Sequence, residues 1–233
     1  MDAIILAGGL GTRLRSVVNE VPKCMAPVCG RPFLHYLLRY VSQFKEIDHV
    51  ILSVGYLREC IFEWMKGQDL PFDVSYAIEE TPLGTGGGIK LALQQVRSDQ
   101  AVILNGDTLF NVDLSELAKR GRESAQAITI ALKEMEHFDR YGTVSLSSDS
   151  VIERFNEKQP CEKGLINGGI YFIDLERFPL DRFPDKGSFE KEVLEASVSG
   201  RILSGYISDG YFIDIGIPSD YRKANVDFQE LFD

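Results

Sequence analysis

The sequence predicts an α/β fold, a single-domain three-layer sandwich around a mixed, mostly parallel sheet. In the first half, apolar runs of strand length alternate with stretches of helical periodicity, which is typical of a doubly wound sheet. The second half contains more strands, and neither a linker nor a repeat separates the halves. We therefore expect one domain over residues 1–233, with a first half at 1–125 and a second half at 126–233.

Four short runs in the first half predict strands. Their almost continuous apolar character is typical of parallel strands that are covered on both faces of a sheet. The runs lie at residues 2–7, 49–54, 73–78 and 101–104.

Helices are expected between these strands. After Pro32, apolar residues recur three and four positions apart as far as Phe44, which gives one apolar helical face. Asp113 followed by Glu116 resembles a capping box that opens a helix through about Arg120. Two more helices are expected at 57–66 and from the glycines at 84–88 through residue 96.

The second half predicts six strands and two helices. Ser188 is expected to cap a helix through residue 196, and Ser219 to cap the closing helix through Phe232. The strands are expected at 127–133, 143–146, 151–155, 169–173, 202–207 and 211–214.

Charge and composition narrow the class of partner. The formal charge is −10, which argues against a broad nucleic-acid surface but leaves room for a small anion-binding pocket. The four cysteines lack metal-binding spacing, so we expect reduced thiols. The opening apolar run ends at Ala7, too early for a membrane span or a secretion signal. We therefore expect a cytoplasmic protein without a membrane partner.

The first glycine loop fits neither of two common nucleotide motifs. Gly8, Gly9 and Gly11 lead into Thr-Arg-Leu, without the Lys-Ser/Thr pair of a P-loop. The dinucleotide fingerprint G-x-G-x-x-G fails at Leu14.

The residues around that loop still suit phosphate. Glycine lets a ligand approach the backbone closely, and an arginine offers planar donors for phosphate oxygens. Arg13 supplies those donors, Thr12 adjoins it, and Lys23 adds a second cation. The alternative is a tight surface turn with a solvated arginine.

Two aspartates occupy ends of predicted strands. Asp107 follows a buried strand in NGD, and Asp214 lies in YFIDIGIP. Ligands of open α/β sheets gather outside the carboxyl ends of strands. Two carboxylates, completed by phosphate oxygens and waters, suit Mg²⁺. The alternative is a turn or cap role.

The segments GGLGTRL and PKCMAPVCGRPFL resemble the signature of the sugar 1-phosphate nucleotidylyltransferases. Within that signature, Cys24 stands where proline is usual. Further landmarks recur along nearly the whole chain, and the resemblance implies the Rossmann-like nucleotide-diphospho-sugar transferase fold. Within the family, LGTGGGI and KCMAPVCGRPFLHYLL are most similar to heptose 1-phosphate guanylyltransferases, and next to mannose 1-phosphate guanylyltransferases.

The resemblance implies a Mg²⁺-dependent reaction in which a sugar 1-phosphate attacks the α-phosphorus of a nucleoside triphosphate. The G-D and D-x-G contexts match the family's metal-binding aspartates at Asp107 and Asp214, and pyrophosphate leaves beside Arg13. The implied catalytic residues are Arg13, Lys23, Asp107 and Asp214. The implied nucleotide-binding residues are Leu6, Ala7, Gly8, Gly9, Gly11, Thr12, Arg13, Glu79, Glu80, Gly84 and Thr85.

The second glycine cluster, from Glu79 to Gly88, is placed over the nucleobase by the same resemblance. A carboxylate matches guanine, which offers a ring N–H and an amino group side by side, whereas the carbonyls of uracil and thymine would repel it. This favours GTP. The choice between Glu79 and Glu80 as the reader stays open, and a solvated loop is the alternative.

Three further segments resemble the family's sugar site, so the resemblance implies a nucleotide-binding half at 1–125 and a sugar-binding half at 126–233. Tyr141 and Gly142 match Y-G-x-V, Glu157 and Lys158 match E-K-P up to the Gln that replaces the proline, and the third segment matches N-x-G-x-Y. The implied sugar-phosphate-binding residues are Tyr141, Gly142, Glu157, Lys158, Asn167 and Gly168. Phe212 and Ile217 stand where relatives often have tryptophan and threonine or serine.

Several identities of the acceptor sugar are compatible with the sequence. D-glycero-D-manno-heptose 1-phosphate is the first choice, followed by mannose 1-phosphate with GTP, or hexose 1-phosphates with CTP, UTP or dTTP. A second hypothesis is a catalytically silent nucleotide-sugar sensor on the same scaffold. Intact aspartates and an intact glycine loop favour the enzyme.

Overall fold

The computed structural model describes residues 1–9 and 21–232, and four runs of the first half form neighbouring strands. They are β1 (Asp2–Leu6), β4 (His49–Val54), β5 (Asp73–Ile78) and β6 (Gln100–Asn105). β1 pairs in parallel with β4 and with β6, and β5 extends the sheet in parallel beyond β4. The four predicted strands are confirmed, β1 one residue shorter and β6 one residue longer at each end.

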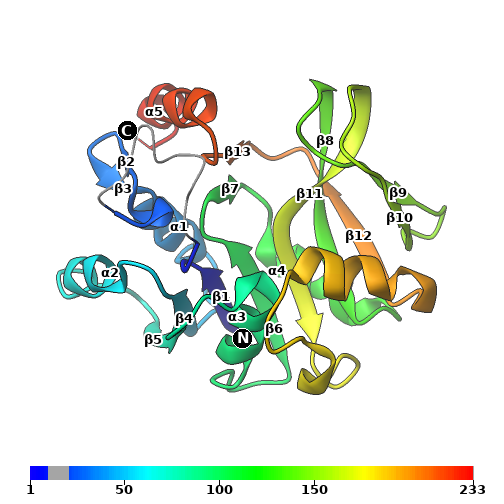
Figure 1. The fold of residues 1–233 in the computed structure, drawn as a ribbon, viewed down its shortest axis with the longest axis horizontal. Helices are drawn as coiled ribbons and strands as arrows, with labels where there is room; N and C mark the ends of the chain where they lie inside the picture. Colours follow the sequence, from blue (N-terminus) through cyan, green and yellow to red (C-terminus); the bar gives the residue numbers. More distant parts are fainter. Residues whose placement is uncertain (10–20, 233) are drawn as a thin grey trace.

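Three strands of the second half complete the sheet. They are β8 (Ile128–Phe138), β11 (Cys161–Asp174) and β12 (Leu203–Ser208). β11 runs antiparallel between β6 and β8, while β12 lies parallel to β8, so the order is β12-β8-β11-β6-β1-β4-β5. The predicted mixed, mostly parallel sheet is confirmed. Figure 1 shows β4 and β5 toward one side of the molecule and β8 to β12 toward the other, with β6 between.

Helices cover both faces of this sheet. They are α1 (Phe33–Val41), α2 (Arg58–Met65), α3 (Gly84–Leu93), α4 (Leu114–Glu123), α5 (Pro218–Phe232) and the π-helical η3 (Glu190–Glu195). Successive side chains of a strand point to opposite faces. Accordingly Ala3 and Ile5 pack in the core with α1, α2, α4 and α5, while Ile4 packs with α3 and η3. The predicted three-layer sandwich is confirmed.

Two of the three predicted helix caps are confirmed and one is wrong. Asp113 accepts a hydrogen bond from the Glu116 backbone N–H at 3.0 Å and caps α4. Ser188 accepts from the Lys191 N–H at 3.2 Å, as expected. The prediction for Ser219 is wrong, because α5 begins at Pro218, whose fixed φ suits the first helical position. None of the described helices has the length and apolarity that a bilayer crossing requires.

Several short elements escaped prediction because they hold only two or three residues. β2 (Pro27–Val28) pairs with β3 (Arg31–Pro32), and η1 (Lys23–Met25) precedes them. β7 (Thr108–Phe110) was not predicted; it pairs antiparallel with β13 (Phe212–Asp214), which confirms the strand predicted at 211–214. η2 (Leu180–Arg182) and η4 (Val198–Gly200) were not predicted either. In contrast, β9 (Val144–Leu146) and β10 (Ile152–Phe155) confirm the strands predicted at 143–146 and 151–155, each one residue shorter.

β8 and β11 are much longer than predicted. The sequence predicted 127–133 and 169–173, but their outer ends continue as a two-stranded extension in which Lys163 lies opposite Glu136. Residues 134–137 of that extension are largely exposed and polar. An apolar run therefore marks only the part of each strand that lies in the core.

Gly121 tests how tightly α4 packs on the sheet. A methyl group at this position would lie 2.1 Å from a ring carbon of the fully buried Phe172. We expect Gly121→Ala to lower the free energy of unfolding by about 1–3 kcal/mol through overpacking. Alanine's better helix propensity offsets only about 1 kcal/mol. Urea denaturation measures the difference, with Lys119→Ala on the exposed face of α4 as a control; a more stable Gly121→Ala protein would contradict the packing.

Candidate active site

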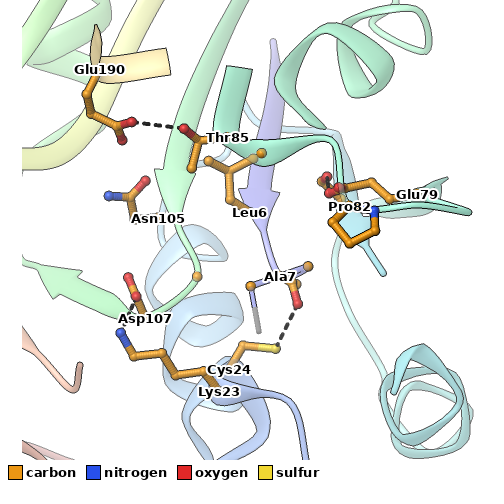
Figure 2. Close-up of a pocket in the computed structure, with 15 residues that line it drawn as sticks. Leu6, Ala7, Lys23, Cys24, Glu79, Pro82, Thr85, Asn105, Asp107 and Glu190 are labelled. Atoms are coloured by element: carbon orange, nitrogen blue, oxygen red, sulfur yellow. Dashed lines mark hydrogen bonds and ion pairs between the residues drawn. The ribbon is translucent and has the colours of Figure 1, made fainter. Parts of the chain in front are cut away.

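A cavity of about 520 Å³ lies where the carboxyl ends of β1, β4 and β6 meet. This is the edge at which open α/β sheets bind ligands. Its lining residues come from the ends of these strands and the loops after them, from the loop after β5, from η1, from the start of α3 and from η3 (Figure 2). They are Leu6, Ala7, Gly8, Gly9, Lys23, Cys24, Ser53, Glu79, Pro82, Gly84, Thr85, Asn105, Gly106, Asp107 and Glu190.

One end of the cavity carries a lysine between two carboxylates. The Lys23 ammonium donates to Asp107 Oδ2, and its Nζ lies 3.5 Å from Asp214 Oδ1. Burial and the charge of Asp107 raise the pKa of Asp214, while Lys23 lowers it. Two carboxylates share a single ammonium group here, so additional positive charge would stabilise the ionised form of both.

The chain brings these side chains together through two glycines. A side chain at Gly106 would come within 2.3 Å of the Leu6 carbonyl oxygen, so glycine lets the end of β6 lie against β1 beside Asp107. At Gly216, a side chain would lie 2.8 Å from both Asp214 Oδ1 and Lys23 Nζ. The Gly216 N–H also donates to Asp214 Oδ1 at 2.7 Å, which explains the D-x-G pattern.

The short β7–β13 ladder fixes the second aspartate. It sets Asp214 opposite Thr108, the residue after Asp107. The Ile215 N–H then donates to the Asp107 carbonyl oxygen at 3.0 Å. Two aspartates that are far apart in the sequence are therefore neighbours through backbone pairing.

The aspartate pair fits a hard divalent cation. Within residues 1–9 and 21–232, no group of three or more His, Cys, Asp or Glu side chains is arranged to hold a metal. Mg²⁺ does not require such a cage, because it is usually bound by one or two carboxylates together with waters and substrate phosphates. Asp107 and Asp214 are such a pair, and their mutual repulsion favours a cation between them.

Of the two glutamates that could read the base, only Glu79 lies in the cavity wall opposite the aspartates. Glu79 accepts from the Ser53 hydroxyl at 3.2 Å and from the Leu83 N–H at 3.0 Å, and it lines the cavity. A side chain at Gly8 would meet Glu79 Oε1 at 2.7 Å, so the glycine loop leaves room for this carboxylate. Glu80 is 76% exposed and pairs with Arg58 at 3.3 Å outside the cavity. The structure thus brings Glu79, and not Glu80, to the cavity.

The glycines at the start of α3 serve close packing. Gly84 has φ +76°, and a side chain there would lie 2.4 Å from the Gly187 carbonyl oxygen. The Gly86 N–H donates to that oxygen at 2.9 Å, and the Gly187 N–H donates to the Leu83 carbonyl at 2.7 Å. A loop of the second half is thereby held against the cavity wall, next to Thr85.

Most of the predicted nucleotide-binding and catalytic residues that the structure describes line the cavity. Those that line it are Leu6, Ala7, Gly8, Gly9, Lys23, Glu79, Gly84, Thr85 and Asp107. The predicted Gly11, Thr12 and Arg13 lie outside the described residues.

Tyr141 and Gly142, predicted for the sugar, lie beside Asp214 and β10. The Tyr141 ring packs edge-on against Phe212 with centroids 6.0 Å apart. Burial, followed by the charge of Asp214, raises the pKa of Tyr141. A side chain at Gly142 would meet the Asn156 carbonyl oxygen at 2.3 Å, so this glycine allows close strand approach.

The other predicted sugar residues divide into two groups. Asn167 accepts from the Gly169 N–H at 2.9 Å and donates to the Tyr171 hydroxyl at 3.0 Å. Gly168 packs against Phe110, where any side chain would clash. Glu157 and Lys158 are exposed between β10 and β11. None of the six predicted sugar residues is among the described residues that line the cavity, and their sugar contacts stay predictions.

Six lining residues were not predicted: Cys24, Ser53, Pro82, Asn105, Gly106 and Glu190. Asn105 and Gly106 directly precede Asp107, so their place at a strand end was an available signal. Glu190 has no such local signal, because it reaches the cavity only through packing of η3 against α3. Cys24 Sγ lies 3.7 Å from the Ala7 carbonyl oxygen, and burial raises its pKa to about 12.

Cys24 should therefore be inert toward thiol reagents in the folded protein. Burial and the neighbouring Asp107 both favour the neutral thiol, so at pH 8 only about one molecule in ten thousand carries the reactive thiolate. Mass-spectrometric mapping of iodoacetamide labelling at pH 8 should find Cys161 modified long before Cys24. Equal labelling rates in the native protein would contradict this burial, and unfolding in urea should abolish the difference.

Comparison with known proteins agrees with this geometry. A family model described as nucleotidyl transferase matches residues 2–230. A D-glycero-alpha-D-manno-heptose 1-phosphate guanylyltransferase from Aneurinibacillus thermoaerophilus is 47% identical over 229 residues, which cover 98% of this chain and 99% of that protein. A protein of the same name from Campylobacter jejuni is 44% identical over 221 residues, covering 95% and 97%.

A solved structure is also similar. The crystal structure of HddC from Yersinia pseudotuberculosis complexed with GMP-PN superposes with a TM-score of 0.85 at 34% identity, covering 97% of this chain and 99% of that one. The family resemblance of the glycine-loop signature is thus confirmed over almost the full length. The chain belongs to the nucleotidyl transferase family.

Proposed function

We propose that this chain transfers GMP from GTP to D-glycero-α-D-manno-heptose 1-phosphate, giving the GDP-sugar and pyrophosphate. The observation that carries the proposal is the convergence of Asp107, Asp214 and Lys23 at one end of a cavity whose other wall presents Glu79. The relatives from Aneurinibacillus and Campylobacter, named for this reaction and matching nearly end to end, support it.

The reaction depends on the alignment of the two substrates more than on proton transfer. An oxygen of the sugar phosphate forms a bond to the α-phosphorus, and the bond from that phosphorus to the bridging oxygen of the β-phosphate breaks. A phosphate monoester has a second pKa near 6, so the attacking group is already largely dianionic at neutral pH. Positioning and electrostatic stabilisation then dominate the rate.

The charged cluster suits this task. Lys23 is 11% exposed and faces the two aspartates, so it can pair with phosphate oxygens at the reacting centre. Asp107 and Asp214 would hold Mg²⁺ through their carboxylates, with phosphates and waters as the other ligands. Bound Mg²⁺ supplies positive charge that offsets the repulsion between the two substrates. From the family signature we propose Arg13 beside the departing pyrophosphate, with Gly11 and Thr12 in the phosphate loop.

Base recognition is assigned to Glu79. The Ser53 hydroxyl and the Leu83 N–H orient its carboxylate, which retains lone pairs for two further donors. Guanine offers its ring N–H and its amino group as such donors. Uracil and thymine would instead present carbonyl oxygens to a carboxylate.

On the sugar side, the assignments rest on the family motifs. We propose that Glu157 and Asn167 bind hydroxyls, that Lys158 pairs with the sugar phosphate, and that Tyr141 and Gly142 shape this part of the site. Gly168 would serve by letting β11 pass close to Phe110.

Pyrophosphate release tests the proposed function directly. Wild-type protein with GTP and the heptose 1-phosphate should release pyrophosphate only when Mg²⁺ is present. Asp214→Asn should lower kcat by about 10²–10³-fold, the scale for losing one charge-stabilising group. Asp181→Asn, an exposed aspartate in η2, is the matched control and should retain wild-type activity. Activity that persists in EDTA and in Asp214→Asn, or activity only with pyrimidine nucleotides, would contradict the proposal.

The two neighbouring glutamates provide a matched pair for base recognition. Glu79→Gln should lower kcat/KM for GTP by about tenfold or more, because a charge-assisted hydrogen bond contributes about 1.5–3 kcal/mol. Glu80→Gln makes the same chemical change outside the cavity and should leave kcat/KM near the wild-type value. Initial rates at varied GTP measure both. The reverse pattern would assign the base to Glu80.

A further inference from the structure

Glu190 reaches the nucleotide cavity from the other half of the chain. Among the described lining residues, it alone comes from beyond residue 125. It begins the π-helical segment η3, and π-helical turns recur at functional sites. None of the motifs that predict the phosphate, base or sugar contacts contains it.

The Glu190 carboxylate is held in one orientation. The Thr85 hydroxyl donates to its Oε2 at 2.9 Å, and the Ser188 hydroxyl donates to the same oxygen at 2.8 Å. Each hydroxyl also accepts a backbone N–H, from Phe189 at 2.8 Å and from Lys191 at 3.2 Å. Because a hydroxyl has a single proton, both must present it to Oε2. The position therefore requires a side chain that ends in an acceptor.

The second oxygen of Glu190 remains for a ligand. Both hydrogen bonds that the described residues give to Glu190 end on Oε2, which leaves Oε1 as an available acceptor at the cavity. Asn105 lines the same cavity, and in Figure 2 it lies with Glu190 and Asp107 on the side of the view away from Glu79. A side chain at Gly169 would lie 2.7 Å from Asn105 Nδ2, so this glycine leaves room for the carboxamide.

Glu190 also lies close to the predicted sugar residues. Tyr171 is fully buried, and its pKa is raised by that burial and next by the charge of Glu190. The Tyr171 hydroxyl accepts from Asn167 at 3.0 Å. The Glu190 carboxylate is thus placed between the start of α3 and the N-x-G-x-Y segment.

A carboxylate and a carboxamide that line the same cavity suit two adjacent hydroxyl groups of a ligand. One hydroxyl donates to the carboxylate oxygen, and its neighbour accepts from the amide. Both substrates of the proposed function carry a cis vicinal diol, at the 2′ and 3′ positions of ribose and at the 2 and 3 positions of a manno-configured sugar. We propose that Glu190, with Asn105, is a specificity-determining residue that binds a vicinal diol of the substrate. This inference rests on the proposed function.

Glu190→Gln tests the role while preserving the fold. The amide oxygen can still accept from Thr85 and Ser188, and the amide nitrogen then replaces the cavity-facing acceptor with a donor. The measurement is kcat/KM for pyrophosphate release with GTP against 2′-deoxy-GTP and 3′-deoxy-GTP, and with the sugar 1-phosphate against its 2-deoxy analogue. Wild type should prefer the hydroxylated member by about 10–100-fold, and the variant should lose most of that preference for one substrate.

The pattern of lost preferences distinguishes which diol Glu190 binds. A loss confined to the nucleotide pairs identifies the ribose diol, and a loss confined to the sugar pair identifies the acceptor diol. Equal slowing of both members of every pair, or unchanged preferences, would overturn the inference. Glu195→Gln, an exposed glutamate of η3, should keep the wild-type preferences. If wild type turned over another nucleotide and sugar instead, the proposed function would fail, and the same ratios measured on that pair would still decide the role of Glu190.

Discussion

The repulsion between Asp107 and Asp214 is the constraint on which the site depends. Two carboxylates that share one lysine are unfavourable unless the backbone fixes them, and here each is fixed at a strand end. Gly106 is required because a side chain would clash with the Leu6 carbonyl, and Gly216 because a side chain would push Asp214 or Lys23 away. The energy stored in that arrangement is recovered when cations and phosphates enter, which is the electrostatic preorganisation that phosphoryl transfer uses.

The parts of the fold that could be predicted are those whose signal is local. β4 was predicted to the residue because its hydrophobic run is buried throughout, and β5, a partly buried edge strand, was also predicted to the residue. The outer ends of β8 and β11 gave no such signal, since they pair with each other while their side chains face water. The cap prediction at Ser219 was wrong because Pro218 before it already starts the helix, although serine is a residue type that suits a cap.

The same distinction holds for the site. Asp107 and the glycine loop were recognisable because each follows a buried strand within a few residues. Glu79 and Glu80 have the same chemistry and adjacent positions, so only the geometry separates the residue bonded to Ser53 and Leu83 from the one paired with Arg58. Glu190 and Ser53 reach the cavity through tertiary packing, which no short motif encodes.

The packing of Gly84 and Gly86 on Gly187 also has a consequence for synthesis. A chain that emerges from the ribosome from its N-terminus has made β1, β4, β5 and β6 long before residue 187 appears. The wall that carries Thr85 cannot be completed until that later segment docks, and Asp214 arrives later still. The nascent protein can therefore build most of its parallel sheet while it is still unable to hold both carboxylates together, so the site forms only after the segment that carries Asp214 has been made.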